Sequence, residues 1–254
     1  MFSRIKRFFS RSHPTVFKKP LEDLIMNSNE IPEFLGILCK EILSQVASEG
    51  IFRKCGDQSL VNLMGEQAMK PNFTIPPQSN INDLTSFLKQ WLRELPQPIL
   101  TPSVVKQFYQ NSELQSTKLI LRNLNPINRK SLALLFNIMK EVINNSEVNL
   151  MNRSNLFICF TPSLLQESQL IDYGTEFSFE NFLDNAISLL NENGNDFTNL
   201  EPFKLRTTST AKYQSTPTPE NQTANIFGEV SFAIAPQCNA NRANRFPPKI
   251  RSNS

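Results

Sequence analysis

The chain has 254 residues, of which 39% are hydrophobic and 19% charged, enough for one sizeable core with tails or for two small domains. Only seven residues are glycine, and apolar residues recur at helical spacing, so an all-α class is predicted. Four scattered cysteines without a CxxC pair, and His13 as the single histidine, argue against a disulfide framework or a zinc site.

Charge is distributed unevenly behind a net value of +3. Residues 1–19 carry six basic and no acidic side chains, and residues 202–254 carry seven basic and two acidic ones. Residues 20–201 hold 13 basic and 21 acidic side chains, a net charge of −8. An acidic body therefore lies between two basic arms.

The first segment, residues 1–19, is predicted to be a basic amphipathic or disordered arm. Phe2, Ile5, Phe8 and Phe9 fall at helical spacing among its cations. One interpretation is peripheral contact with an anionic membrane, and the other is a solvated basic tail. No apolar run reaches the length of a membrane span, and the N-terminus lacks the apolar stretch of a secretion signal. A reducing, cytoplasmic location is therefore expected, with peripheral attachment at the plasma membrane if the arm binds lipid.

Residues 20–199 are predicted to form one helical domain, with no internal repeat and no strand pattern of useful length. Apolar periodicity and capping residues predict helices over 33–48, 59–69, 83–95, 102–112, 114–123, 126–144, 153–166 and 178–192. Gly50 is expected to stop the first of these helices. Asn125 before Pro126, and Asn152, are expected to cap two of the later ones.

Residues 200–254 are predicted to be a disordered basic tail rich in Ser, Thr, Asn and Pro, because apolar periodicity disappears there. Thr216-Pro217 and Thr218-Pro219 could be sites for proline-directed kinases, and Phe246-Pro247-Pro248-Lys249 could be a proline-rich ligand. Plain linker composition accounts for both patterns as well.

Arg53 is the candidate that matters most, within Glu49-Gly50-Ile51-Phe52-Arg53-Lys54-Cys55-Gly56. It follows an amphipathic helix and lies beside glycines that let the backbone turn. A permanently charged side chain on such a loop can be offered to a partner, although a single exposed arginine is usually only solvated.

Two predicted helices carry polar residues that their packing does not need. The apolar stripe of helix 83–95 is complete without Lys89 and Arg93, which lie side by side four residues apart and repel each other slightly. Helix 153–166 is apolar all round, which predicts burial in a core. It begins near Asn155 and is interrupted by Pro162, and both residues share one face with Cys159.

Together these segments resemble a known family. EGIFRKCG, FLKQWLRELPQPIL and NPINRKSLALLFNIMKEVINNSEVNLMNRSNLFICFTPSLL are similar, in order and spacing, to the signature blocks of a Rho GTPase-activating protein (RhoGAP) domain. The resemblance covers about residues 20–195. It implies a RhoGAP-like all-α bundle of roughly eight or nine helices.

The resemblance also implies roles for matching residues. Arg53 takes the place of the family's arginine finger, inserted beside the phosphates of GTP on a partner GTPase. Lys89 and Arg93 match cations that line the same groove, with Lys89 expected to steady the loop or contact the partner. Asn155 matches an asparagine that faces the partner's switch region. Gly50 and Pro162 are implied structural positions at this interface.

Three departures from the family pattern stand out. The approach ILSQVASEG, which leads into Glu49-Gly50, is several residues short. Phe157 stands where a small residue is usual after the asparagine–leucine pair, and Thr161 replaces a small residue before Pro162. The first change affects how the Arg53 loop begins, and the other two affect the face that would meet the partner.

Three functions are compared on this basis. The first is a GTPase activator, not itself an enzyme, that acts on a GTP-loaded Rho-family GTPase. The second is a module of the same fold that binds and sequesters the GTPase without catalysis. The third, a nucleic-acid binder with basic arms, lacks an aromatic-rich basic face and a recognised motif. Neither a metal nor a cofactor is expected in this chain, because the partner carries GTP and Mg²⁺, and no obligate oligomer is indicated.

Overall fold

The computed structural model describes residues 14–110, 113–165 and 176–192. Within these residues the helices are α1 (Glu33–Ser44), α2 (Gln58–Gln67), α3 (Ile81–Glu94), α4 (Pro102–Gln110), α5 (Leu114–Asn123), α6 (Pro126–Asn144), α7 (Ser146–Asn149), α8 (Arg153–Leu164) and α10 (Glu176–Glu192). A 3₁₀ turn, η1 (Leu21–Asp23), precedes them. The predicted all-α bundle is confirmed. The segments 1–13 of the predicted arm and 193–254, including the predicted tail, lie outside the described residues.

Several helices begin where short polar side chains predict. Asn125 accepts a hydrogen bond from the amide of Ile127 and is followed by Pro126 at the first helical position of α6. Asn152 accepts one from the amide of Asn155 at the start of α8. At α3, Asn80 and Asp83 form a reciprocal capping box.

The first helix ends earlier than predicted. α1 stops at Ser44 rather than at residue 48, because the chain tightens into turns in which the amide of Gln45 bonds to the carbonyl of Ile42 and that of Ser48 to the carbonyl of Gln45. Gly50 is therefore not the stop of this helix. Its positive φ of 71° serves the loop that follows. The short helix α7 also went unpredicted, because four residues are too few to show helical periodicity.

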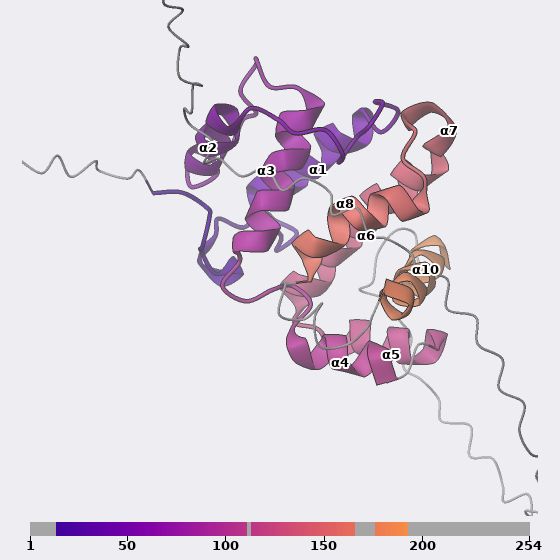
Figure 1. Ribbon diagram of the computed structural model, residues 1–254. Coiled ribbons are helices and arrows are strands. Elements are labelled where there is room, and N and C mark those ends of the chain that lie inside the picture. The colour runs from indigo at the N-terminus through magenta and orange to yellow at the C-terminus, as the bar shows by residue number, and fades with distance from the viewer. Residues whose placement is uncertain (1–13, 111–112, 166–175, 193–254) are drawn as a thin grey trace, which may run out of the picture.

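Two clusters of aromatic rings fill the bundle. The first aromatic cluster lies among the N-terminal helices and contains Phe17, Phe34, Phe73, Phe87 and Trp91. The second aromatic cluster joins α4, α6, α8 and α10 and contains Phe108, Phe136, Phe157, Phe179 and Phe182. Figure 1 shows α1, α2 and α3 on one side of the bundle and α4, α5 and α10 on the other.

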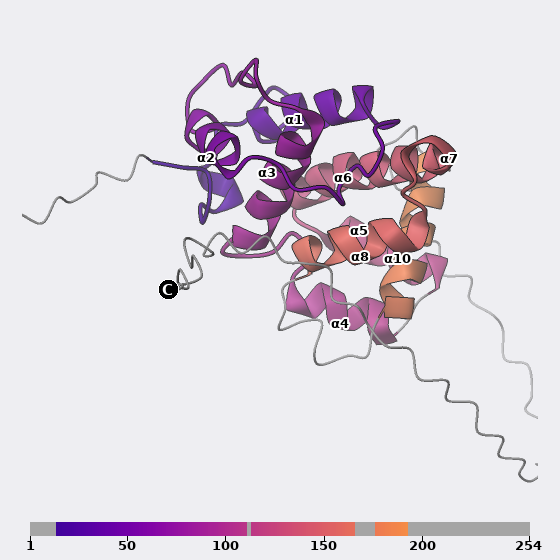
Figure 2. The ribbon, with the colours of Figure 1, turned by 45° about the horizontal axis from the view of Figure 1, so that its top comes forward.

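α6 and α8 run between these two groups, as the turned view confirms (Figure 2). α8 packs against both α3 and α6. Its first residue, Arg153, makes ion pairs with Asp184 (2.5 Å) and Glu180 (3.8 Å) of α10. The helix is thus held between the two halves of the bundle. None of the helices in the described part of the chain is long and apolar enough to cross a membrane.

Candidate functional site

Residues 48–57, called here the Arg53 loop, connect the turns after α1 to the start of α2. The backbone reverses twice, at Gly50 (φ 71°) and at Phe52 (φ 66°). A left-handed backbone costs a non-glycine residue about 1–2 kcal/mol, so Phe52 must be held there by its surroundings. Its ring is fully buried and packs edge-on against Phe160 of α8, with centroids 5.1 Å apart. Burial of Phe52 leaves the next residue, Arg53, exposed.

Both ends of the Arg53 loop are fixed by hydrogen bonds to distant segments. At its start, the amide of Gly50 donates to the carbonyl of Asn149 (2.8 Å). At its end, the amide of Gly56 donates to the hydroxyl of Ser86 (2.9 Å) and that of Asp57 to the carboxylate of Asp83 (2.6 Å). Between these anchors, residues 53–55 are exposed. The base of the loop is therefore fixed on both sides, and the side chain of Arg53 is exposed between the two anchors.

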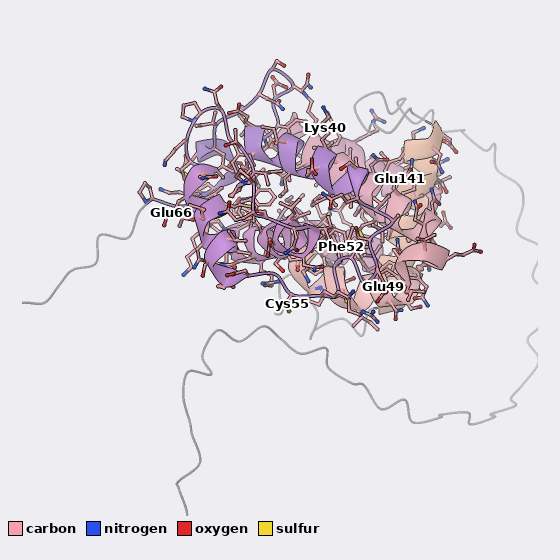
Figure 3. All side chains as sticks on the ribbon, turned by 90° about the horizontal axis from the view of Figure 1, so that it is seen from above. Lys40, Glu49, Phe52, Cys55, Glu66 and Glu141 are labelled. Carbon is pink, nitrogen blue, oxygen red and sulfur yellow. The ribbon has the colours of Figure 1, made fainter. Side chains whose placement is uncertain are left out.

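Gly56 allows the loop to approach α3 closely. A Cβ at this position would lie 2.5 Å from the Cα of Asp83, a backbone atom that cannot move aside. Glycine is thus required here because a larger residue would clash with α3, and not because the backbone adopts a left-handed conformation. Figure 3 shows Glu49, Phe52 and Cys55 near one another on one side of the molecule, which marks the course of the loop.

The cations of α3 face the loop and α8. Lys89 donates a hydrogen bond from Nζ to the carbonyl of Phe52 (2.6 Å). The pKa of Lys89 is lowered, mainly by burial. The sulfur of Cys159 opposes this shift, and the positive charge of Arg93 adds to it. Arg93 donates from Nη1 to the hydroxyl of Ser163 on α8 (3.4 Å). Lys89 therefore joins α3 to the loop, and Arg93 joins α3 to α8.

The face of α8 that carries Asn155, Cys159 and Pro162 completes the site. Asn155 and Cys159 are half-buried, Pro162 is exposed, and the neighbouring Ile158 is 53% exposed. The prediction that this helix is buried all round is therefore wrong. One face packs into the bundle, and the other is left to the surface beside the Arg53 loop.

The thiol of Cys159 lies among charges from the other two elements. Burial raises the pKa of its thiol, while the positive charges of Lys89 and Arg53 act in the opposite direction. Arg53 from the loop and Lys89 from α3 thus both act on the same thiol of α8. The arrangement places the exposed, permanently charged Arg53 beside the half-buried Lys89 and Cys159, and such an arginine suits an anionic group on a partner.

Several residues that hold this site were not singled out from the sequence. They are the buried Phe52 of the Arg53 loop itself and three residues of the bundle that bond to the loop, Ser86, Asp83 and Asn149. Asp83 had a usable signal, since Asn80 three residues earlier forms a capping-box pattern. The others make contacts across long stretches of chain that no local pattern reports. In the described residues, no group of three or more His, Cys, Asp or Glu is arranged to hold a metal ion.

The sequence matches the family model described as RhoGAP domain over residues 32–169. The chain belongs to the RhoGAP domain family. The match spans the Arg53 loop, α3 and α8, the three elements that build the site. The departure at Phe157 is accommodated within this RhoGAP domain, because its ring packs edge-on against Phe179 of α10 at 5.6 Å.

Two curated relatives illustrate the similarity of this RhoGAP domain. "Rho GTPase-activating protein gacY" of Dictyostelium discoideum is 30% identical over 202 residues, covering 71% of this chain and 28% of the relative. "Rho GTPase-activating protein conundrum" of Drosophila melanogaster is 30% identical over 152 residues, covering 54% of this chain and 24% of the relative. The chain therefore spans about a quarter of the length of either protein.

Solved structures agree on the fold of the RhoGAP domain. Human Rho GTPase activating protein 15 superposes with a TM-score of 0.60 at 22% identity, covering 74% of this chain and 97% of that one. The BH domain from GRAF, described as the GTPase regulator associated with focal adhesion kinase, gives a TM-score of 0.55 at 25% identity. That match covers 67% of this chain and 98% of the BH domain.

Proposed function

We propose that this chain activates GTP hydrolysis by a Rho-family GTPase, with Arg53 as the arginine finger. The observation that carries the proposal is the Arg53 loop itself. An exposed arginine stands at the tip of a loop whose base is fixed on both sides. Such a side chain can enter a partner's site without the loop having to be ordered first.

The chemistry suits arginine. Hydrolysis of GTP spreads negative charge over the transferring phosphoryl group, and a planar, permanently charged guanidinium can donate several hydrogen bonds to it. An arginine finger accelerates hydrolysis about 10³- to 10⁵-fold, which corresponds to about 4–7 kcal/mol of barrier. In this proposal GTP and Mg²⁺ are carried by the GTPase, and the chain supplies the finger and the binding surface.

The other residues of the site have supporting roles in this proposal. Lys89 steadies the finger loop, a role supported by its hydrogen bond to the carbonyl of Phe52. Arg93 ties α3 to α8 through Ser163. Asn155, half-buried on the face of α8 beside the loop, contacts the switch region of the GTPase. Gly50 and Pro162 shape the backbone on either side of this surface.

A panel of Rho-family GTPases in single-turnover hydrolysis assays tests the proposal. The chain is expected to accelerate hydrolysis by at least one GTPase and to bind its GTP-loaded form. If the chain binds a GTPase but accelerates none, it is the sequestering module instead. If it neither binds nor accelerates any member, the proposal fails as a whole.

Residues 1–19 are proposed to add peripheral contact with an anionic membrane. The proposal rests on their six cations and on the spacing of their aromatic residues. Cosedimentation with vesicles containing phosphatidylserine tests it, with a chain lacking residues 1–15 as the comparison. Equal pelleting of the two chains would contradict it.

A further inference from the structure

Asn149, the last residue of α7, is a fully buried polar residue that binds three separate parts of the bundle. Its side-chain amide donates to the carbonyl of Val46 (2.9 Å) and to that of Val142 (2.8 Å). Its side-chain oxygen accepts from the amide of Met151 (2.8 Å). Its own carbonyl accepts from the amide of Gly50 (2.8 Å).

These partners place Asn149 under the start of the Arg53 loop. Val46 and Gly50 lie on either side of the turn that leads into the loop, about a hundred residues away along the chain. Val142 belongs to α6, and Met151 lies just before α8. A single residue therefore fixes the start of the loop against both central helices.

The same hydrogen bonds reach the other side of the site. Leu150, which follows Asn149, has a positive φ of 58°, and its carbonyl accepts a hydrogen bond from the side chain of Asn155 (3.5 Å). A left-handed backbone at a leucine is costly, so it must be held in place by its neighbours. The bonds of Asn149 on either side of this residue supply that constraint.

Local bonds alone would not place the loop. From Gln45 to Ile51 the amides of Gln45, Ser48 and Ile51 bond to carbonyls three residues earlier. Turn bonds of this kind set the curvature of the chain but not its position on the bundle. The bonds to Asn149 connect this curved segment to the helices.

We propose that Asn149 is a positioning residue for the arginine finger, holding the start of the Arg53 loop so that Arg53 is presented in one conformation. The inference rests on the function proposed above. Asparagine suits the role because its side chain offers two donors and an acceptor. Aspartate has nearly the same shape but no donor, and would set a negative charge against two carbonyls.

The first test measures loop order without any GTPase. Hydrogen–deuterium exchange of the full chain is compared for wild type, Asn149→Asp and Asn149→Ser, whose hydroxyl keeps one donor and one acceptor. Faster exchange confined to residues 46–53, with α3 and α6 unchanged, is expected for Asn149→Ser and more strongly for Asn149→Asp. Unchanged exchange in this segment would overturn the inference.

The second test measures catalysis. The maximal single-turnover rate at saturating chain is expected to fall about 10-fold or more in Asn149→Asp, because both bonds donated by the side-chain amide are lost. Affinity for the GTPase loaded with a non-hydrolysable GTP analogue should change less than about threefold, a shift of under 1 kcal/mol. The matched control is Asn145→Asp, which loses a bond to the carbonyl of Glu141 at the end of α6 and should keep the wild-type rate.

A double substitution separates positioning from general damage. If Asn149 acts through Arg53, then Asn149→Asp should have no further effect on the rate in an Arg53→Ala chain. An equal fold-loss in both backgrounds, or a wild-type rate in Asn149→Asp, would overturn the inference and leave the proposed function standing. A wild-type chain that activates no GTPase would overturn the proposed function, while the exchange experiment would still test how Asn149 holds the loop.

Discussion

The Arg53 loop and the second aromatic cluster are held by different forces. The loop is fixed by a few directed hydrogen bonds: its amides donate to Asn149, Ser86 and Asp83, and one of its carbonyls accepts from Lys89. The second aromatic cluster is held by ring packing, with Phe108 stacked on Phe182 at 4.7 Å and Phe179 edge-on to Phe157 at 5.6 Å. Hydrogen bonds specify one geometry, whereas apolar burial supplies most of the stability.

This difference separates two kinds of substitution. Removing Arg53, or the hydrogen bond from Lys89 to the backbone of its loop, should alter the rate of GTP hydrolysis with little effect on the free energy of unfolding. Changes in the second aromatic cluster should do the opposite.

Arg53→Ala should have the largest effect, and this effect should appear only in the rate of GTP hydrolysis. Arg53 is exposed, so its loss should leave the melting temperature within about 1–2 °C of wild type, as for an ordinary surface change. The maximal hydrolysis rate should fall about 10³- to 10⁵-fold. Affinity for the GTP-loaded GTPase should be largely retained. Lys54→Ala, at the next exposed position, is the matched control, and an equal loss of rate there would contradict the role of Arg53.

Phe182→Ala should affect stability alone. The ring is fully buried and contacts both Phe108 and Phe136, so its removal leaves a cavity and should lower the free energy of unfolding by about 3–5 kcal/mol. Denaturant unfolding measures this change. The hydrolysis rate per folded molecule should stay within twofold of wild type, which corresponds to a change of about 0.4 kcal/mol in the activation free energy. Leu119→Ala, half-exposed on α5, should change stability by less than about 0.5 kcal/mol.

Lys89→Met tests a helix residue that supports the Arg53 loop through one hydrogen bond. Burial lowers the pKa of this amine, which means that its charge is disfavoured by its surroundings; methionine keeps the apolar stem without that charge. Removing a disfavoured charge and removing its hydrogen bond act in opposite directions, so the free energy of unfolding should change by less than about 1 kcal/mol. The bond to the Phe52 carbonyl is lost, and the rate should fall about 10- to 100-fold, for a charged hydrogen bond of about 1.5–3 kcal/mol. Lys106→Met on α4, where the lysine is exposed, is the control. A wild-type rate in Lys89→Met would contradict the proposal that Lys89 steadies the loop for catalysis.

Glu30→Gln should have the smallest effect, confined to acid pH. Lys130 bonds to Glu30 at 2.7 Å and lowers the pKa of that carboxyl below 4.5. A lowered pKa in the folded state stabilises the fold above pH 4.5, and this contribution is lost as the pH falls through the folded-state pKa. Melting temperatures measured through this range should fall less steeply for Glu30→Gln than for wild type. The same dependence of melting temperature on pH in both chains would contradict a stabilising role for this ion pair. At neutral pH, Glu30→Gln should stimulate GTP hydrolysis by the partner GTPase to the wild-type rate.

The fold was more predictable from the sequence than the site. Periodicity and caps placed α3 and α6 to within two residues, because helical packing and capping depend on residues a few positions apart. Arg53, Lys89 and Asn155 were found through family resemblance, and the structure brings Arg53 and Lys89 to the same part of α8.

The supports of the Arg53 loop could not be found in this way. The positive φ of Phe52 and the contacts of Asn149 arise from packing between segments about a hundred residues apart. The exposure of Ile158 was also missed, since an apolar sequence does not show which face of α8 the rest of the bundle covers.

The central claim is that Arg53 acts on the transition state of GTP hydrolysis. It is tested most directly by comparing affinities for one GTPase in two states, loaded with GDP and aluminium fluoride or with a non-hydrolysable GTP analogue. The wild-type chain should prefer the transition-state mimic by about 10²-fold or more, and Arg53→Ala should lose that preference while still binding the GTP analogue. Equal affinity of the wild-type chain for both states, or a preference retained without Arg53, would contradict the account.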